Sequence, residues 1–110
     1  MAAEFLGVPA GWMPYVRLFV QRAYGIGQDL DVAVTSWHRT RSHNREVGGV
    51  DASQHLVATA WDVSGPDQDL YAARAASSGL VVVDEGDHIH VQLFRAGVLP
   101  AWVFDQVARA

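Results

Sequence analysis

The spacing of hydrophobic residues divides the chain into helical and extended segments. Residues 13–24 (MPYVRLFVQRAY) carry apolar side chains at helical intervals, with a proline in the first turn and glycines just beyond the end. This spacing predicts a helix in which Tyr15, Leu18 and Phe19 pack on the core. A second helix is predicted over residues 66–78 (PDQDLYAARAASS), which begin with proline and acidic residues and are followed by glycine.

Four segments have the composition of strands. Residues 30–37 (LDVAVTSW) are β-branched and alternate between apolar and polar, and residues 59–63 (TAWDV) have a similar character. Residues 80–84 (LVVVD) and 87–94 (DHIHVQLF) are separated by Glu85-Gly86, which predicts a short two-residue hairpin between two antiparallel strands.

The remaining segments complete the predicted fold. Residues 38–54 are polar and contain a Gly-Gly pair, so we expect a long ordered loop, a feature that is often functional in a small domain. Residues 99–110 (LPAWVFDQVARA) are predicted to close the chain as a helix. We therefore expect a single α+β domain over residues 1–110, with about four strands in a small, mostly antiparallel sheet and about three helices packed on it.

Composition narrows the classes of function. Half of the 110 residues are hydrophobic, which is enough to build a core, and cysteine is absent, so a metal would have to be held by histidine and carboxylate groups. A net charge of −4 disfavours nucleic-acid binding, because phosphate neutralisation requires a basic surface.

The amino-terminal segment (MAAEFLGVPAGWMPYVRLFV) lacks a basic start and is interrupted by glycine and proline, so it does not resemble a signal peptide. No apolar run approaches the roughly 20 residues that span a bilayer. We expect synthesis in the cytoplasm without a signal peptide and no insertion into a membrane.

Three of the five histidines lie beside carboxylates. His55 and Asp62 are seven residues apart, and a second group contains Asp87, His88 and His90. Two histidines and one carboxylate form a common ligand set for catalytic zinc, which leaves one position for water. His88 and His90 are two residues apart on a predicted strand and therefore project from the same face. This spacing alone is equally compatible with polar groups at the surface.

A longer pattern resembles a known family. The family pattern S-x-H-x-x-G-x-A-x-D is followed by H-x-H or by an acid three residues before a histidine. Matching positions extend over roughly residues 30–95, and they are Thr35-Ser36, Arg39, Asn44, Val47-Gly48-Gly49, Ser53, His55, Ala60, Asp62, Asp87, His88 and His90. The chain thereby resembles the zinc D-alanyl-D-alanine carboxypeptidases and L-alanyl-D-glutamate endopeptidases, which share their fold with the Hedgehog signalling domain.

One position departs from this pattern. The family glycine is Ala58 here, which implies either an ordinary backbone conformation or a slight displacement of the loop, because glycine is the residue that permits a positive φ.

The resemblance implies a role for each matching site residue. One zinc ion per chain would be bound by His55, Asp62 and His90. Asp87 would be the general base, which takes a proton from the water that zinc activates and passes it to the leaving amine.

Further roles follow from the same resemblance. Arg39 would stabilise the oxyanion or bind a substrate carboxylate, His88 would assist at the oxyanion, and Ser53 would contact substrate or support the loop.

Strand geometry offers alternatives to Asp87 as the base. In a strict two-residue hairpin Asp87 and His90 are an odd number of residues apart and should face opposite sides of the sheet. Asp84 and Glu85 are then rival bases, and Asp84 shares the parity of His90. A bulge at Gly86 would instead turn Asp87 toward the metal. The family pattern favours Asp87, with Asp84 second.

The resemblance implies a zinc peptidase that hydrolyses peptide bonds in the stem peptides of peptidoglycan. We expect a phage-type lysin or a virion-associated wall hydrolase. Such a protein would act on the cell wall after release or as part of a virion, where other virion proteins would be its partners. The alternative is a non-catalytic, zinc-stabilised structural or binding domain of the same fold. The bond that is cleaved, and endo versus exo action, remain open.

Overall fold

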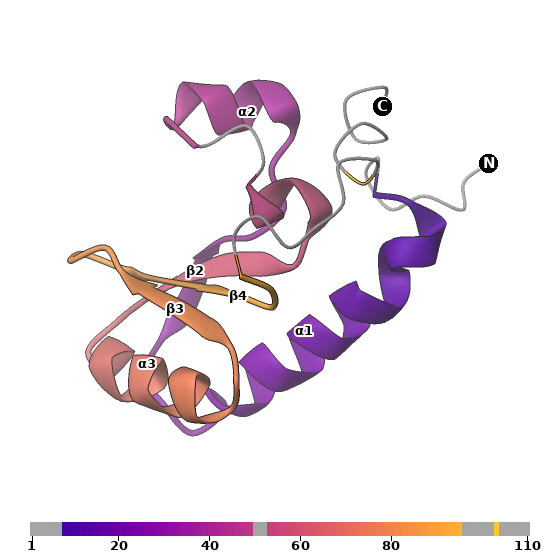
Figure 1. The fold of residues 1–110 in the computed structure, drawn as a ribbon. Coiled ribbons are helices and arrows are strands. Elements are labelled where there is room, and N and C mark those ends of the chain that lie inside the picture. Colours follow the sequence, from indigo (N-terminus) through magenta and orange to yellow (C-terminus); the bar gives the residue numbers. More distant parts are fainter. Residues whose placement is uncertain (1–7, 50–52, 96–102, 104–110) are drawn as a thin grey trace.

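The computed structural model describes residues 8–49, 53–95 and Val103. The described part forms an α+β domain with a four-stranded sheet in the order β1-β2-β4-β3, in which every neighbouring pair is antiparallel, as expected (Figure 1). The elements are η1 (Ala10–Trp12), α1 (Met13–Gly25), β1 (Ala33–Ser36), α2 (Arg41–Glu46), η2 (Gln54–Val57), β2 (Ala60–Ser64), α3 (Gln68–Ser77), β3 (Val81–Asp84) and β4 (Ile89–Gln92).

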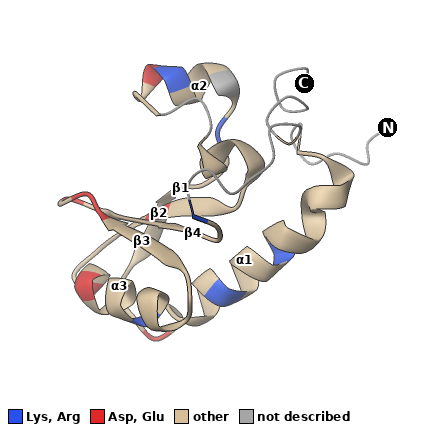
Figure 2. Cartoon of the chain, viewed as in Figure 1, with Lys and Arg blue, Asp and Glu red and all other residues tan. Residues whose placement is uncertain are grey.

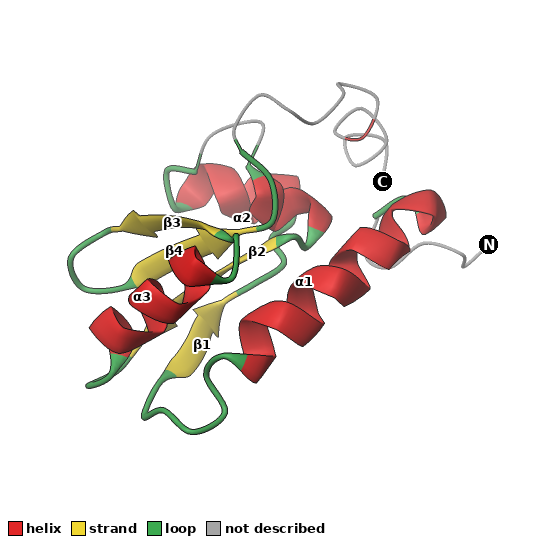
Figure 3. Ribbon diagram, turned by 60° about the horizontal axis from the view of Figure 1, so that its bottom comes forward, coloured by secondary structure: helices red, strands yellow, loops and turns green. Residues whose placement is uncertain are grey.

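The two faces of the sheet have different surroundings because side chains alternate along each strand. Helices α1 and α3 cover one face, and α2 lies on the other side (Figure 3). The covered face carries the main core, to which α1, α3, β2 and β4 contribute Phe19, Ala23, Tyr71, Ala75, Trp61, Val63, Ile89 and Val91. Alternation therefore directs the intervening residues of β2 and β4 to the opposite, polar face.

A buried hydrogen-bond chain connects the two covering helices to the sheet. The indole Nε1 of Trp61 donates to the hydroxyl of Tyr71 at 3.1 Å, and that hydroxyl donates to the carbonyl of Ala23 at 2.7 Å. The polar ends of both aromatic side chains are thus paired, so their rings are buried without an unsatisfied group.

Helix α1 is present as predicted, but its buried face differs from the prediction. Val16, Phe19 and Ala23 are buried, whereas Tyr15 and Leu18 remain 42% and 38% exposed. The prediction was therefore correct for Phe19 and wrong for Leu18, whereas Tyr15 is partly exposed and packs its ring on the buried Trp12, with centroids 4.7 Å apart. Tyr15 and Leu18 each precede a buried position by one, which rotates their side chains about 100° away from the core-facing stripe.

The segment predicted as one long loop contains a helix. Helix α2 occupies Arg41–Glu46, and its amino terminus is capped by Thr40, whose Oγ1 accepts a hydrogen bond from the backbone N–H of His43 at 3.2 Å. The loop prediction was wrong over these residues because α2 is short and has no apolar stripe. Its one buried side chain among those described is Asn44.

A β-bulge on β1 changes which residues face the polar side. Val34 pairs with Val63 and Ser36 pairs with Asp62, so Thr35 is an extra residue between them. Without the bulge Thr35 would pair with Asp62, and Ser36 would face the helices. The bulge therefore places Ser36 on the same side as Asp62.

The β3–β4 hairpin has a two-residue turn, as predicted, but the turn lies one residue later in the chain than Glu85-Gly86. Asp84 pairs with Ile89, the N–H of Glu85 donates to the carbonyl of His88 at 3.0 Å, and the turn itself is Gly86-Asp87, with φ of +88° at the glycine. Directly paired residues share a face, so Asp84 lies on the face of Ile89 and away from the polar side. The parity argument for Asp84 was wrong, because it assumed a different register.

The predicted helix over residues 99–110 lies outside the described residues except for Val103, which is buried against a second cluster formed by η1, η2 and the start of α1. Within the described part of the chain, the helices are too short or too polar to cross a membrane.

Candidate metal centre

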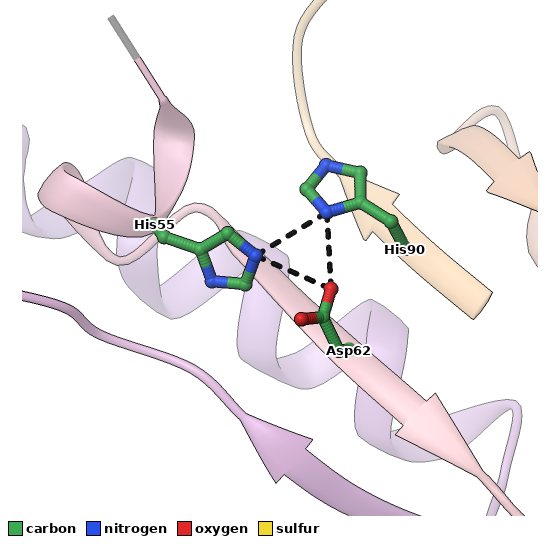
Figure 4. Close-up of side chains that lie close together, drawn as sticks. All are labelled: His55, Asp62 and His90. Atoms are coloured by element: carbon green, nitrogen blue, oxygen red, sulfur yellow. Dashed lines mark hydrogen bonds and ion pairs between the residues drawn. The ribbon is translucent and has the colours of Figure 1, made fainter. Parts of the chain in front are cut away.

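Three side chains from three elements meet on the polar side of the sheet. His55 lies on η2, Asp62 on β2 and His90 on β4, where Asp62 and His90 are directly paired across the two strands. His55 Nε2 lies 3.2 Å from Asp62 Oδ1, His90 Nδ1 lies 3.1 Å from the same oxygen, and the two nitrogens are 3.3 Å apart (Figure 4). The three predicted ligands therefore converge on one point.

The separations within this triad match the geometry of zinc. Zinc bonds to imidazole nitrogen and carboxylate oxygen are about 2.0–2.1 Å long, so two ligands of a tetrahedral ion lie about 3.3 Å apart. The three observed separations of 3.1–3.3 Å agree with this edge length, and all three atoms fall within the range for one ion.

The tautomer of His55 is fixed by the backbone. Its Nδ1 lies 2.6 Å from the carbonyl oxygen of Trp37, which can only accept, so Nδ1 carries the proton and Nε2 directs a lone pair at the centre of the triad. Ser53 caps the turn that carries His55, since its Oγ accepts from the backbone N–H of His55 at 3.2 Å. This contact fits the supporting role considered for Ser53.

His90 is oriented by a residue that sequence reasoning missed. Its Nε2 lies 2.7 Å from Gln92 Oε1, and the amide nitrogen of Gln92 donates to the carbonyl of Phe94 at 2.6 Å, which fixes the orientation of the amide. His90 Nε2 is therefore the donor, and Nδ1 points at the centre. Gln92 lies two residues after His90 on the same predicted strand, so the two side chains project from the same face. This spacing could have identified Gln92 as a neighbour of His90.

The contacts within the triad shift the pKa values of Asp62 and His90. Burial alone would raise the pKa of Asp62, but hydrogen bonds with His55 and His90 hold it well below its usual value. Burial would lower the pKa of His90, but its contacts with Asp62 and Gln92, together with the charge of Glu85, raise it. A proton and a metal ion would therefore compete for His90 Nδ1.

Arg39 lies beside the triad, on the far side of the Asp62 carboxylate. Its NH2 nitrogen is 3.1 Å from Asp62 Oδ2, and its side chain is only 13% exposed. Its backbone N–H also donates to the carbonyl of His55 at 3.0 Å. The predicted site residue Arg39 is therefore in contact with a candidate ligand and with the backbone of a second one.

His88 and Asp87 form a pair at the edge of the site. His88 Nε2 lies 3.9 Å from Asp62 Oδ2, while its Nδ1 lies 2.6 Å from Asp87 Oδ1. The Asp87 side chain is 90% exposed because the residue belongs to the turn. Among the described acidic residues of the hairpin, Glu85 is the one that borders the cavity beside the triad.

This cavity has a volume of about 590 Å³, which is within the range of sites for small ligands. Its wall combines apolar and charged groups, among them Val47, Val81, Val83, Arg39, Glu85 and Arg95. Acidic residues gather at the tip of the β3–β4 hairpin, basic residues lie along α1, and α2 carries residues of both charges (Figure 2). Arg95 was not singled out from the sequence, because it lies outside the matching motif.

Residues 19–92 match the model of a family described as Peptidase M15. This segment contains the whole sheet, the three α-helices in part or in full, and all three residues of the triad. No curated protein and no solved structure matches the chain.

The triad predicts the metal content. We expect about one zinc ion per chain, and His90→Ala should lose the ion and lower the melting temperature, because the ion connects β2, β4 and η2. Metal analysis and thermal melting test this expectation. His43→Ala is the matched control, since His43 is an exposed histidine on α2 that pairs with the exposed Glu46. Full zinc occupancy in His90→Ala would exclude His90 as a ligand.

The pKa shifts predict how the stability of the metal-free protein depends on pH. The lowered pKa of Asp62 contributes stability above its ordinary value of 3.8, and this contribution is lost as pH falls through the folded-state pKa. The raised pKa of His90 contributes below its ordinary value of 6.5 and is lost as pH rises through the folded-state pKa. Melting in chelator should therefore be highest between about pH 4 and 6.5.

Saturating zinc should move this optimum to higher pH, because the ion replaces the proton on His90. An optimum that is the same with zinc and with chelator would contradict the assignment of His90 as both the proton site and the metal ligand.

Proposed function

This chain belongs to the peptidase M15 family, and we propose that it is a zinc metallopeptidase that hydrolyses peptide bonds in the stem peptides of peptidoglycan. The observation that carries the proposal is the triad of His55, Asp62 and His90 beside an accessible cavity. Both imidazoles are held by other groups in the tautomer that directs a lone pair at the metal position. A solvated polar cluster has no need of this arrangement.

Zinc at this position would supply Lewis acidity, which lowers the pKa of a water molecule toward 7 and polarises a substrate carbonyl. The protein then has to accept a proton and deliver it to the leaving amine. We propose Asp87 for this role and Glu85 as its rival. The Asp87 carboxylate contacts His88 in this structure. The contact between a general base and the proton that it accepts commonly forms only in the substrate complex, and rotation of the exposed Asp87 side chain toward the site costs little.

His88 would assist at the substrate oxygen. Its Nδ1 is paired with Asp87, so its Nε2 is directed toward the Asp62 side of the site. A side chain in this position can donate a hydrogen bond to an oxygen on which negative charge develops.

The cavity wall suits a short peptide with small side chains and carboxylates. Val81 and Val83 provide an apolar surface for alanine methyl groups, and Arg95 provides a guanidinium at the same cavity for a carboxylate. Stem peptides contain both kinds of group, which supports this substrate class.

The test of the function uses purified peptidoglycan. The zinc-loaded protein should release new amino groups, an excess of chelator should abolish the release, and added zinc should restore it. Mass spectrometry of the released fragments identifies the bond and distinguishes endo from exo action. Zinc binding without release from any stem peptide would instead indicate a non-catalytic, zinc-stabilised domain.

Substitutions in the hairpin test the base. Asp87→Asn should retain zinc and fold but lose hydrolysis by about 10²-fold or more, the usual scale for loss of a general base. Asp84→Asn is the matched control in the same hairpin, since Asp84 lies on the other face, where its carboxylate accepts from the N–H of Gly86. If Glu85→Gln is inactive and Asp87→Asn is active, Glu85 is the base.

A further inference from the structure

The guanidinium of Arg39 is held by acceptors from three separate elements. Its Nε donates to Ser36 Oγ on β1 at 3.3 Å, its NH1 donates to Asn44 Oδ1 on α2 at 3.2 Å, and its NH2 donates to Asp62 Oδ2 on β2 at 3.1 Å. All three nitrogens of the group are therefore engaged within the protein. The plane of the guanidinium is fixed by these contacts before any substrate arrives.

Because of the contact with Arg39, the two oxygens of the Asp62 carboxylate have different partners. Oδ1 faces the two histidine nitrogens, whereas Oδ2 is bonded to the guanidinium. A carboxylate held in this way presents one oxygen to a metal and cannot rotate away without breaking a charge-assisted hydrogen bond. Arg39 thus determines how Asp62 meets the metal position.

A second layer of contacts holds Arg39 itself. Asn44 is 1% exposed, and its side-chain oxygen is the acceptor for Arg39 NH1. Gly49 packs directly against this amide, and a Cβ atom at Gly49 would collide with the Asn44 side chain. The N–H of Gly49 also donates to the carbonyl of Asn44 at 2.8 Å. Only glycine therefore allows the backbone to approach Asn44 this closely.

We propose that Arg39 is a positioning residue for the metal ligand Asp62, with Asn44 and Gly49 holding it in place. The inference rests on the proposed metal site. Ser36 at the end of β1, and Asn44 and Gly49 in the segment that follows it, all contribute to the orientation of this one guanidinium. Residues that orient a metal ligand typically change metal affinity by about 10–100-fold when they are removed.

The test measures zinc affinity of the purified full chain by competition with a chromophoric chelator, which requires no activity. Arg39→Ala should weaken zinc binding by about 10–100-fold, and Asn44→Ala should weaken it in the same direction by a smaller factor. Arg39→Lys keeps the charge but loses the planar fork, so its affinity should lie between those of Arg39→Ala and the wild type. Arg45→Ala, an exposed arginine beside Asn44 on α2, is the matched control and should bind zinc as the wild type does.

Turnover at saturating zinc separates the two roles of Arg39. A positioning residue predicts that Arg39→Ala recovers most of its kcat once the site is filled, whereas loss of an oxyanion donor leaves a deficit of about 10²–10³-fold. Unchanged zinc affinity in a folded Arg39→Ala or Arg39→Lys variant, with the wild type binding normally, overturns this inference alone. A wild-type chain that binds no zinc overturns the proposed function as well.

Discussion

The carboxylate of Asp62 is the group on which the arrangement of the site depends. It is buried, and burial of an unpaired charge is costly, so the surrounding chain has to supply partners for both oxygens. His55 and His90 approach one oxygen and Arg39 approaches the other. The elements that carry these partners lie far apart in the sequence, and each must be in its native place for the charge to be tolerated. Folding of the domain and assembly of the site are therefore coupled.

The candidate ligands could be predicted because the chain matches the family pattern and because strands and short motifs place side chains regularly. Asp62 and His90 lie on strands, where the period of two decides the face of every side chain, and the motif around His55 fixes its distance from Asp62. The α+β class and most elements could be predicted for the same reason, since the apolar positions of α1, α3 and the strands follow the expected periods.

The remaining features depend on contacts that periodicity does not encode. The register of the β3–β4 hairpin follows from the turn at Gly86-Asp87, and a shift of one position reversed the predicted face of Asp84. The bulge at Thr35 is invisible in the alternation of β1. Ala58 occupies a left-handed conformation with φ of 61°, so of the two alternatives for this position the ordinary backbone conformation was wrong. Its buried methyl group and its carbonyl, which accepts from Trp37 Nε1 at 3.0 Å, supply the contacts that hold it in this conformation.

The alternation of the sheet has a consequence for how such a domain can diverge. On β2, Trp61 and Val63 pack against the helices, whereas Asp62 between them faces the site. A substitution at Trp61 or Val63 changes the packing against the helices, whereas a substitution at Asp62 changes the site and, because its charge is buried, folding as well. Positions such as Val81 and Val83 border the cavity and lie outside the core cluster, so their side chains can change with little effect on the core. A domain built in this way could acquire a different cavity lining while its core stays the same.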